Sequence, residues 1–298
     1  MKENQQNFKE ENFIELKNIS LNLKETLFCG QIFHFKEIEH NKLYGGVLND
    51  TLIILKQIDD KRIAFLYDEE GLHCHLSLIK LNQMIKEFFN IDIIVIKQDN
   101  HFKINELIIN DDLICKVFDK HHQSCRFITN DLYSAIFSFI CSQNNNIQRI
   151  TKLVSFIYSL GEPIKYKNIT FNKFPKLDKL FDFDLLKDKK FGYRARYVVD
   201  AAKFLNETPV DNNNISDLLK IKGVGRKVFD CICLTSLRRF HLVPIDIHVF
   251  KWSKVFFKLS FNSLTQKNYQ QIQREWSNKF GRYAGIVQLF IFKESTLK

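Results

Sequence analysis

The spacing of apolar residues changes once along this chain, near residue 76, and that change constrains its fold more than any other feature. Before it, apolar and β-branched residues gather in runs of strand length at 13–16, 51–55 and 62–67. Turn signals separate these runs at Gly45-Gly46 and Asn49-Asp50. This part of the chain predicts a small antiparallel sheet.

After residue 76 the apolar residues follow a helical period. The first such group is Leu78, Leu81, Met84, Ile85 and Phe88. Further helices are predicted at 132–142, 145–160, 193–205, 225–237, 247–257, 264–280 and 283–294, and strand signals are almost absent after about residue 100. The prediction is an α+β protein, with an N-terminal antiparallel β-sheet domain over 1–100 and a mostly α-helical body over 101–298.

The charge balance favours a polyanionic partner. The chain of 298 residues has 44 basic and 34 acidic side chains, for a net charge of +10. Such a surface can displace the counterions condensed on phosphates. A solvated, lysine-rich surface with no such partner is the alternative.

The cysteines and the start of the chain bear on the compartment. Seven cysteines at scattered positions suit reduced thiols better than a disulfide framework. Residues 1–7 are polar and give no secretion signal, and no apolar run approaches the length of a membrane span. We expect a protein that does not associate with a membrane and that is cytoplasmic in a prokaryote or nuclear in a eukaryote.

Two glycines flank Val224 between two predicted helices and indicate a helix–hairpin–helix motif near 218–237. Gly223 and Gly225 allow a sharp turn and a close approach to a ligand. The free amides at the start of the next helix suit a phosphate oxygen. An ordinary interhelical loop, or a hairpin that binds DNA without chemistry, remains open as an alternative.

Lys227 and Asp246 are the candidate chemical groups. Lys227 falls in the first turn of the second helix, where the helix dipole and burial are expected to lower the pKa of its amine and make it a nucleophile. A lysine that clamps a phosphate is the alternative. Asp246 lies 19 residues later at a predicted helix start, where it could be an N-cap or a carboxylate that assists catalysis.

Four segments in this order resemble the helix–hairpin–helix DNA glycosylases, and within them the 8-oxoguanine DNA glycosylase/AP lyases. The segments are 138–147, 192–197, 223–234 and 243–248, and the resemblance runs from about Leu27 to Phe292. It implies that Lys227 attacks the sugar, forms a Schiff base and permits β-elimination, with Asp246 assisting. The implied partner is duplex DNA with 8-oxoguanine opposite cytosine, bound by a monomer without a cofactor.

The resemblance also assigns the residues that recognise the base. The backbone carbonyl of Gly30 would accept the N7–H that 8-oxoguanine has and guanine lacks. Gln288 would read the edge of the flipped base, and Phe292 and Cys231 would hold its two faces. Core packing explains Phe292 equally well from its spacing. The sequence departs from the family pattern at Phe33-His34-Phe35, because the family usually has an arginine and a tryptophan after the first aromatic residue.

The remaining implied roles concern DNA. Asn144 would fill the gap left by base flipping, and Tyr193 would wedge into the stack. Arg149 and Arg194 would read the estranged cytosine, and His248 and the amides of Gly223 and Gly225 would contact phosphate. Without the resemblance, each would be taken as a surface residue of a helix.

Other readings are weaker. An endonuclease III-like or adenine glycosylase needs cysteines for an iron–sulfur cluster, and none follows Cys233. The alkylation-damage glycosylases generally lack the lysine. A metal site at His73, Cys74 and His75, or at His121 and His122, lacks the usual ligand spacing. The carbonyls of the hairpin could hold a structural monovalent cation. A DNA-binding protein without catalysis stays as the alternative function.

Overall fold

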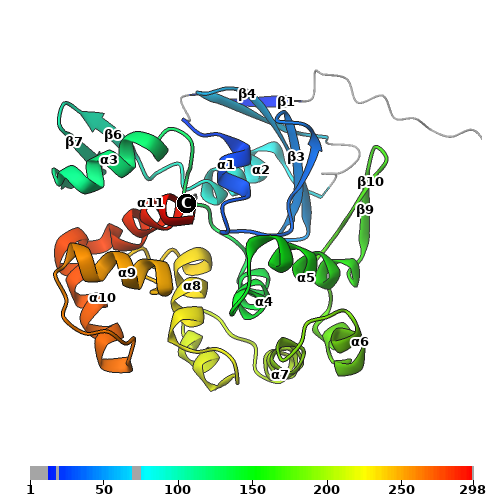
Figure 1. The fold of residues 1–298 in the computed structure, drawn as a ribbon. Coiled ribbons are helices and arrows are strands. Elements are labelled where there is room, and N and C mark those ends of the chain that lie inside the picture. Colours follow the sequence, from blue (N-terminus) through cyan, green and yellow to red (C-terminus); the bar gives the residue numbers. More distant parts are fainter. Residues whose placement is uncertain (1–12, 18–19, 69–74, 297–298) are drawn as a thin grey trace, which may run out of the picture.

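The N-terminal part of the molecule is a five-stranded antiparallel sheet (Figure 1). The computed structural model describes residues 13–17, 20–68 and 75–296. The strand order is β1-β5-β4-β3-β2, with β1 at Phe13–Lys17, β2 at Lys36–Glu39, β3 at Leu43–Leu48, β4 at Thr51–Asp59 and β5 at Arg62–Leu66. A mostly helical body follows, so the predicted α+β fold is confirmed.

Both faces of this sheet are covered. On one face, Ile53 and Leu55 of β4 pack with α1 (Leu23–Leu27) and α2 (Leu78–Phe88). On the other face, Leu52 and Ile54 pack against the hairpin of β9 (Pro163–Tyr166) and β10 (Ile169–Asn172). Burial on both sides explains why β4 begins with an unbroken apolar run instead of an alternating one.

Gly45 and Gly46 do not form a turn; they lie inside β3, so that prediction was wrong. A Cβ atom on Gly45 would lie 2.7 Å from Cζ of Phe171, and one on Gly46 would lie 2.5 Å from Cδ2 of Phe35. The glycines therefore make room for aromatic rings that press on the strand. The predicted turn at Asn49-Asp50 is confirmed, since both residues have positive φ, at 46° and 62°, between β3 and β4.

The seven helices predicted after residue 130 are all present, with boundaries within two residues of those expected. They are α4 (Leu132–Ser142), α5 (Ile147–Ser159), α7 (Arg194–Glu207), α8 (Arg226–Leu237), α9 (Ile247–Phe256), α10 (Gln266–Phe280) and α11 (Ala284–Thr296). The body also contains α3 (Asp112–His121) and α6 (Phe183–Asp188), which were not predicted. Among the described residues, no helix is both long and apolar enough to cross a membrane.

Two small sheets were missed. One is the β9–β10 hairpin, and the other joins β6 (Val95–Gln98), β7 (His101–Ile104) and β8 (Leu107–Ile109). The expectation of almost no strands after residue 100 was therefore wrong. Each of these strands has only three or four residues, too few to show a period. The β6–β8 sheet spans residue 100, and the domain boundary placed there stays a prediction.

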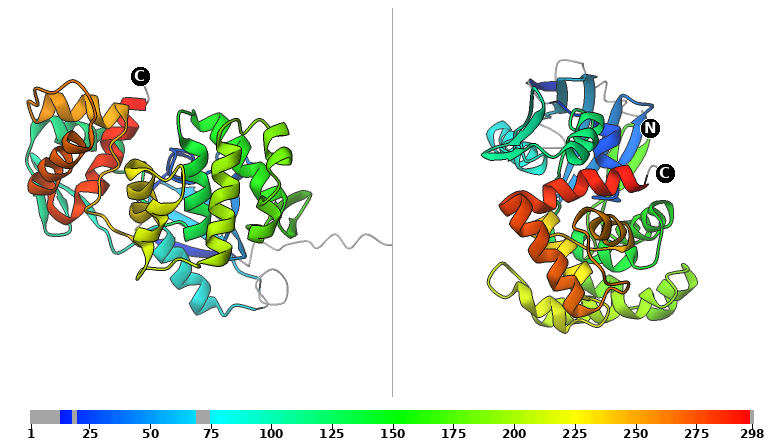
Figure 2. Two further views of the ribbon diagram at one scale, coloured as in Figure 1. Left: turned by 90° about the horizontal axis from the view of Figure 1, so that it is seen from below. Right: turned by 60° about the vertical axis from the view of Figure 1, so that its left-hand side comes forward.

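Helix α8 lies between the two cores of the helical body (Figure 2). Its Ile232 and Cys233 pack with α4, α5 and α7. Its Leu234 packs in the second core, which holds β6–β8, α3 and α9 to α11. Because α8 begins at the glycine hairpin, both cores set where that hairpin and Lys227 lie.

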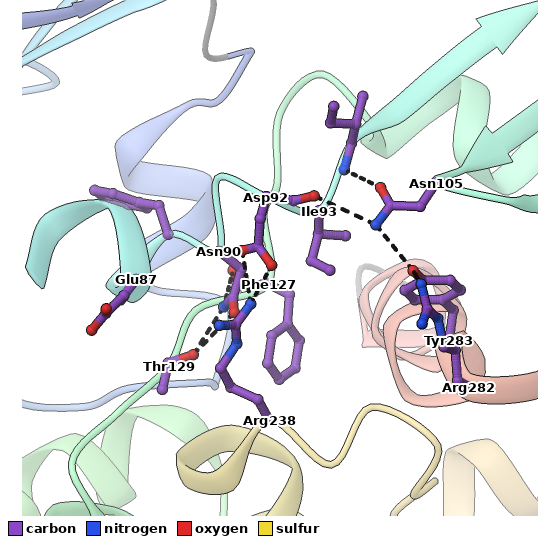
Figure 3. A network of polar contacts seen from close by, with 12 residues as sticks. Glu87, Asn90, Asp92, Ile93, Asn105, Phe127, Thr129, Arg238, Arg282 and Tyr283 are labelled. Atoms are coloured by element: carbon purple, nitrogen blue, oxygen red, sulfur yellow. Dashed lines mark hydrogen bonds and ion pairs between the residues drawn. The ribbon is translucent and has the colours of Figure 1, made fainter. Parts of the chain in front are cut away.

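The far end of α8 is fixed to the segment that follows α2 (Figure 3). Arg238 ends the helix with a φ of 53°, and its Nη2 donates to both carboxylate oxygens of Asp92 at 2.7 and 2.6 Å. Asn105, in the turn between β7 and β8, donates to the Tyr283 hydroxyl at 3.0 Å. The Arg238–Asp92 pair therefore ties the C-terminal end of α8 to the segment after α2.

His34 is buried where the sheet lobe meets α4 and α5, at the position where the family pattern has an arginine. Its ring stacks on Tyr158 at 4.4 Å, and Nε2 lies 2.8 Å from the Val47 carbonyl oxygen. Burial lowers the pKa of His34 to about 4, against the opposing effect of the Val47 hydrogen bond. The ring is therefore neutral and serves the core.

This histidine should make the protein less stable in mild acid. In the unfolded chain His34 takes up a proton near pH 6.5, whereas the folded protein resists protonation down to about pH 4. The free energy of unfolding should therefore fall through that window, by about 3 kcal/mol in total. Nearby Asp131 opposes this fall, because burial raises the pKa of its carboxyl to about 6 and the folded state then binds its proton more tightly.

Asp131→Asn isolates the histidine effect. Asparagine keeps the cap that Asp131 places on the Ser134 amide at 2.7 Å, but it does not titrate. Denaturant unfolding between pH 7 and 4 should show a steeper loss of stability for Asp131→Asn than for the unmodified protein. Equal slopes for the two proteins would contradict the assignment.

Candidate active site

A cavity of about 1000 Å³ opens where the α4–α5 loop, the start of α8, the start of α9 and the end of α11 meet. Seven of the thirteen residues predicted for the site line it: Gly30, Asn144, Gly225, Lys227, Asp246, His248 and Phe292. The fold brings these residues together from segments spread over most of the sequence. The size suits a ligand of the dimensions of a nucleoside.

The glycine hairpin has the form predicted. It follows a 3₁₀ helix at Ile215–Lys220, where an ordinary helix end was expected. Gly223 has a φ of +95°, and a Cβ there would lie 2.5 Å from Cδ2 of Tyr197, so only glycine fits. Gly225 caps α8 without a side-chain hydrogen bond, which leaves the first amides of the helix for an external acceptor.

Lys227 lies on the wall of the cavity, with Nζ 5.8 Å from the centre of the Phe139 ring. Burial lowers the pKa of its ammonium, but Cys231 and the Asp246 carboxylate raise it, and the net pKa lies above the usual value. The predicted lowering was wrong, because Cys231, one turn further along α8, and Asp246 of α9 together outweigh the effect of burial. Burial also raises the pKa of the Cys231 thiol, so this group is uncharged near neutral pH. At that pH the negative charge beside the ammonium is therefore the Asp246 carboxylate.

Asp246 is the N-cap of α9, as one of the two readings predicted. Its Oδ1 accepts hydrogen bonds from the amides of His248 at 2.9 Å and Val249 at 2.8 Å. Both bonds use the same oxygen and fix the plane of the carboxylate. The cap and the catalytic reading are therefore compatible, since capping sets the direction in which the group faces the cavity.

Four residues were predicted to fill the space that the flipped base leaves or to contact the base opposite it. They gather around the α4–α5 loop. Arg194 is buried and donates from Nε to the Gln143 carbonyl and from Nη2 to the Asn144 carbonyl, both at 2.9 Å. The Tyr193 hydroxyl donates to Gln143 at 3.1 Å, and its side chain is 48% exposed. Arg149 is exposed and donates to the Lys190 carbonyl at 3.1 Å. Arg194 thus holds the loop that presents Asn144.

The residues predicted to recognise the base are divided between the wall and the layer behind it. Gly30 has a φ of +95° and lies beside Ile147 and Phe292. The Phe292 ring lies perpendicular to His248 at 6.3 Å. Cys231 and Gln288 are each 7% exposed and are not among the residues that line the cavity.

Sequence reasoning missed several residues around the site. Phe139 lies beneath Lys227, and Tyr269 lines the cavity. Asp230 is fully buried in α8 and is bonded to Tyr269 and Gln273. A lone acidic residue inside the apolar run 228–234 was the available signal, since a buried carboxylate needs specific donors.

The histidines considered for a metal site have other roles where they can be seen. His73 and Cys74 lie outside the described residues. His121 pairs with Glu294 at 3.0 Å, and Nδ1 of His122 lies 2.7 Å from the Phe118 carbonyl oxygen. Within residues 13–17, 20–68 and 75–296, no three potential ligands cluster in a way that could hold a metal.

Comparison with known proteins points to one family. The family profile described as 8-oxoguanine DNA glycosylase, N-terminal domain, matches residues 13–136. The chain is 28% identical to N-glycosylase/DNA lyase OGG1 of Arabidopsis thaliana, over 94% of this chain and 78% of that protein. It is also 28% identical to the N-glycosylase/DNA lyase of Saccharomyces cerevisiae, over 94% of this chain and 85% of that protein.

Solved structures agree with the fold. MBOgg1, bound to a low-affinity DNA ligand, has a TM-score of 0.78 at 23% identity and covers 97% of both chains. The Clostridium acetobutylicum 8-oxoguanine glycosylase/lyase, bound to duplex DNA with cytosine opposite 8-oxoguanine, has a TM-score of 0.77 at 21% identity and covers 97% of this chain and 96% of its own. The profile and the relatives make the chain similar to 8-oxoguanine DNA glycosylases and N-glycosylase/DNA lyases, and the solved structures share its fold.

Proposed function

We propose that this protein excises 8-oxoguanine from duplex DNA and then nicks the strand, as a bifunctional DNA glycosylase and AP lyase in base excision repair. The observation that carries the proposal is a lysine at a hairpin-anchored helix start that shares one cavity with an opposing carboxylate, in a chain similar to N-glycosylase/DNA lyases. A DNA-binding role without catalysis gives no reason for that pairing.

Lys227 supplies the nucleophile. Because its pKa is raised, most of the side chain is an ammonium at neutral pH and must lose a proton before it reacts. The amine then forms a bond to C1′ while the glycosidic bond breaks and the base departs. Loss of a proton and ring opening give a Schiff base, and removal of a C2′ proton expels the 3′ phosphate by β-elimination. Asp246 stabilises positive charge on the sugar and moves protons.

The other residues bind the base and the DNA. The Gly30 carbonyl accepts the N7–H of the lesion, Gln288 reads its edge, and Phe292 and Cys231 hold its faces. Gln288 and Cys231 do not themselves line the cavity, so their contacts with the base need a shift of its wall.

The DNA side of the proposal follows from the loop and the hairpin. Asn144 fills the vacated space, Tyr193 wedges the stack, and Arg149 and Arg194 read the cytosine. His248 and the amides of Gly223 and Gly225 hold phosphates.

We also propose that the protein works as a monomer in the compartment that holds the chromosome. All of these residues belong to a single chain. That compartment is the cytoplasm of a prokaryote or the nucleus of a eukaryote. The chemistry uses no cofactor; a monovalent cation on the hairpin carbonyls would be structural.

The test is an assay on a duplex with one 8-oxoguanine placed opposite each of the four bases in turn. Free base, measured by mass spectrometry, and strand scission, measured on a denaturing gel, should appear together and fastest opposite cytosine. The same duplex with guanine is the control and should stay intact. Tight binding without base release would favour the non-catalytic alternative.

A further inference from the structure

Besides Asp246, a second carboxylate lies close to Lys227: Asp230, three residues further along α8, whose side chain is fully buried. Burying a carboxylate is costly unless strong donors meet it. Oδ2 of Asp230 accepts from the Tyr269 hydroxyl at 2.7 Å and from Nε2 of Gln273 at 2.8 Å. Both donors belong to α10.

Both donors also bind that segment, just before Asp246. The Tyr269 hydroxyl accepts from the Ile245 amide at 3.2 Å. Nε2 of Gln273 donates to the Val243 carbonyl at 2.7 Å, and its Oε1 accepts from the Val243 amide at 3.3 Å. A buried charge on the helix of the nucleophile is thus connected, through two side chains, to the peptides that precede the assisting carboxylate.

This connection matters because Lys227 and Asp246 stand on different elements. Lys227 is fixed by α8, whereas Asp246 is fixed by the start of α9. A misplacement of about 1 Å between reacting groups can cost about 10²-fold in rate. A network of short, buried hydrogen bonds to a charged acceptor resists such a displacement.

We propose that Asp230 is a positioning residue that fixes Asp246 against Lys227 through Tyr269 and Gln273. This inference rests on the proposed function and adds a residue that touches neither the base nor the sugar. Arg226 contributes from the solvent side, since its Nε lies 3.4 Å from Oδ1 of Asp230. Gln273 is the better bridge to test, because Tyr269 also lines the cavity.

Two substitutions at Asp230 separate the hydrogen bonds from the charge. Asp230→Asn can keep an oxygen at the Oδ2 position and accept both bonds, whereas Asp230→Leu has a similar shape and accepts none. In single-turnover excision at saturating enzyme, Asp230→Leu should lower the rate constant by about 10²-fold and Asp230→Asn by much less. The dissociation constant for lesion DNA should stay close to that of the unmodified protein in both.

The readout distinguishes positioning from folding. A variant that is merely unstable has less active enzyme, but at saturation its folded fraction keeps the original rate constant. Ser253→Ala is the matched control, because it removes the buried bond from Nε1 of Trp276 to Ser253 at 2.9 Å, also between α9 and α10 but away from Asp246. It should lower the melting temperature and leave the rate constant unchanged.

Gln273→Leu keeps the test decisive if Asp230→Leu does not fold. It should slow excision by about 10-fold, because it removes the Val243 bridge and leaves Asp230 with one donor. An unchanged rate constant in the active fraction of Asp230→Leu or Gln273→Leu, or an equal slowing in Ser253→Ala, would overturn the inference. Absence of excision by the unmodified protein would overturn the proposed function instead.

Discussion

Lys227→Gln is expected to abolish covalent trapping and to lower base excision by about 10⁴-fold or more, because loss of a nucleophile removes the reaction path itself. With the unmodified protein and an 8-oxoguanine duplex, borohydride should reduce the Schiff base and leave a protein–DNA adduct on a denaturing gel. Glutamine has no amine, so no such adduct can form.

The binding arm of this experiment separates chemistry from affinity. Lys227 lies in a cavity beneath the DNA surface proposed here, so Lys227→Gln should bind the lesion duplex nearly as tightly as the unmodified protein. Lys203→Gln removes the same charge from an exposed position on α7 and should trap normally. Adduct formation by Lys227→Gln at the original rate would exclude Lys227 as the nucleophile.

Asp246→Asn is expected to lower excision by about 10²- to 10³-fold while leaving the protein folded. Asparagine caps a helix as well as aspartate does and can accept the same two amides through its oxygen. What it loses is the negative charge that faces Lys227. Single-turnover excision and thermal melting, measured side by side, give the two effects.

Asp246→Ala completes the comparison, because it removes both the charge and the cap. It should lose activity as Asp246→Asn does and, in addition, lose about 1 kcal/mol of stability through the uncapped start of α9. If Asp246→Asn kept full activity and only Asp246→Ala lost it, the carboxylate would be a cap and nothing more.

The sequence predicted the helical body well because its helices are long enough to repeat their apolar period several times. The short strands β6 to β10 could not be predicted in this way. Gly45 and Gly46 misled because glycine marks both turns and close packing, and only the structure shows the rings of Phe35 and Phe171 against them.

In the site, too, local sequence predicted some features, whereas those that depend on residues distant in sequence were missed. Lys227 and Asp246 could be chosen from their local positions at helix starts, and both line the cavity. The direction of the Lys227 pKa shift could not be predicted, because it depends on how closely Cys231 and Asp246 approach the amine in the folded protein. Asp230 escaped for a similar reason, since its partners Tyr269 and Gln273 lie about 40 residues away on α10.

The buried guanidinium of Arg194 has a consequence for binding. It holds the carbonyls of Gln143 and Asn144, and Asn144 has a φ of 45°. The loop proposed to enter the duplex is therefore held in place by the protein itself, and little conformational entropy is lost when it does so. Loosening that loop would raise the entropic cost of every encounter, for damaged and undamaged DNA alike.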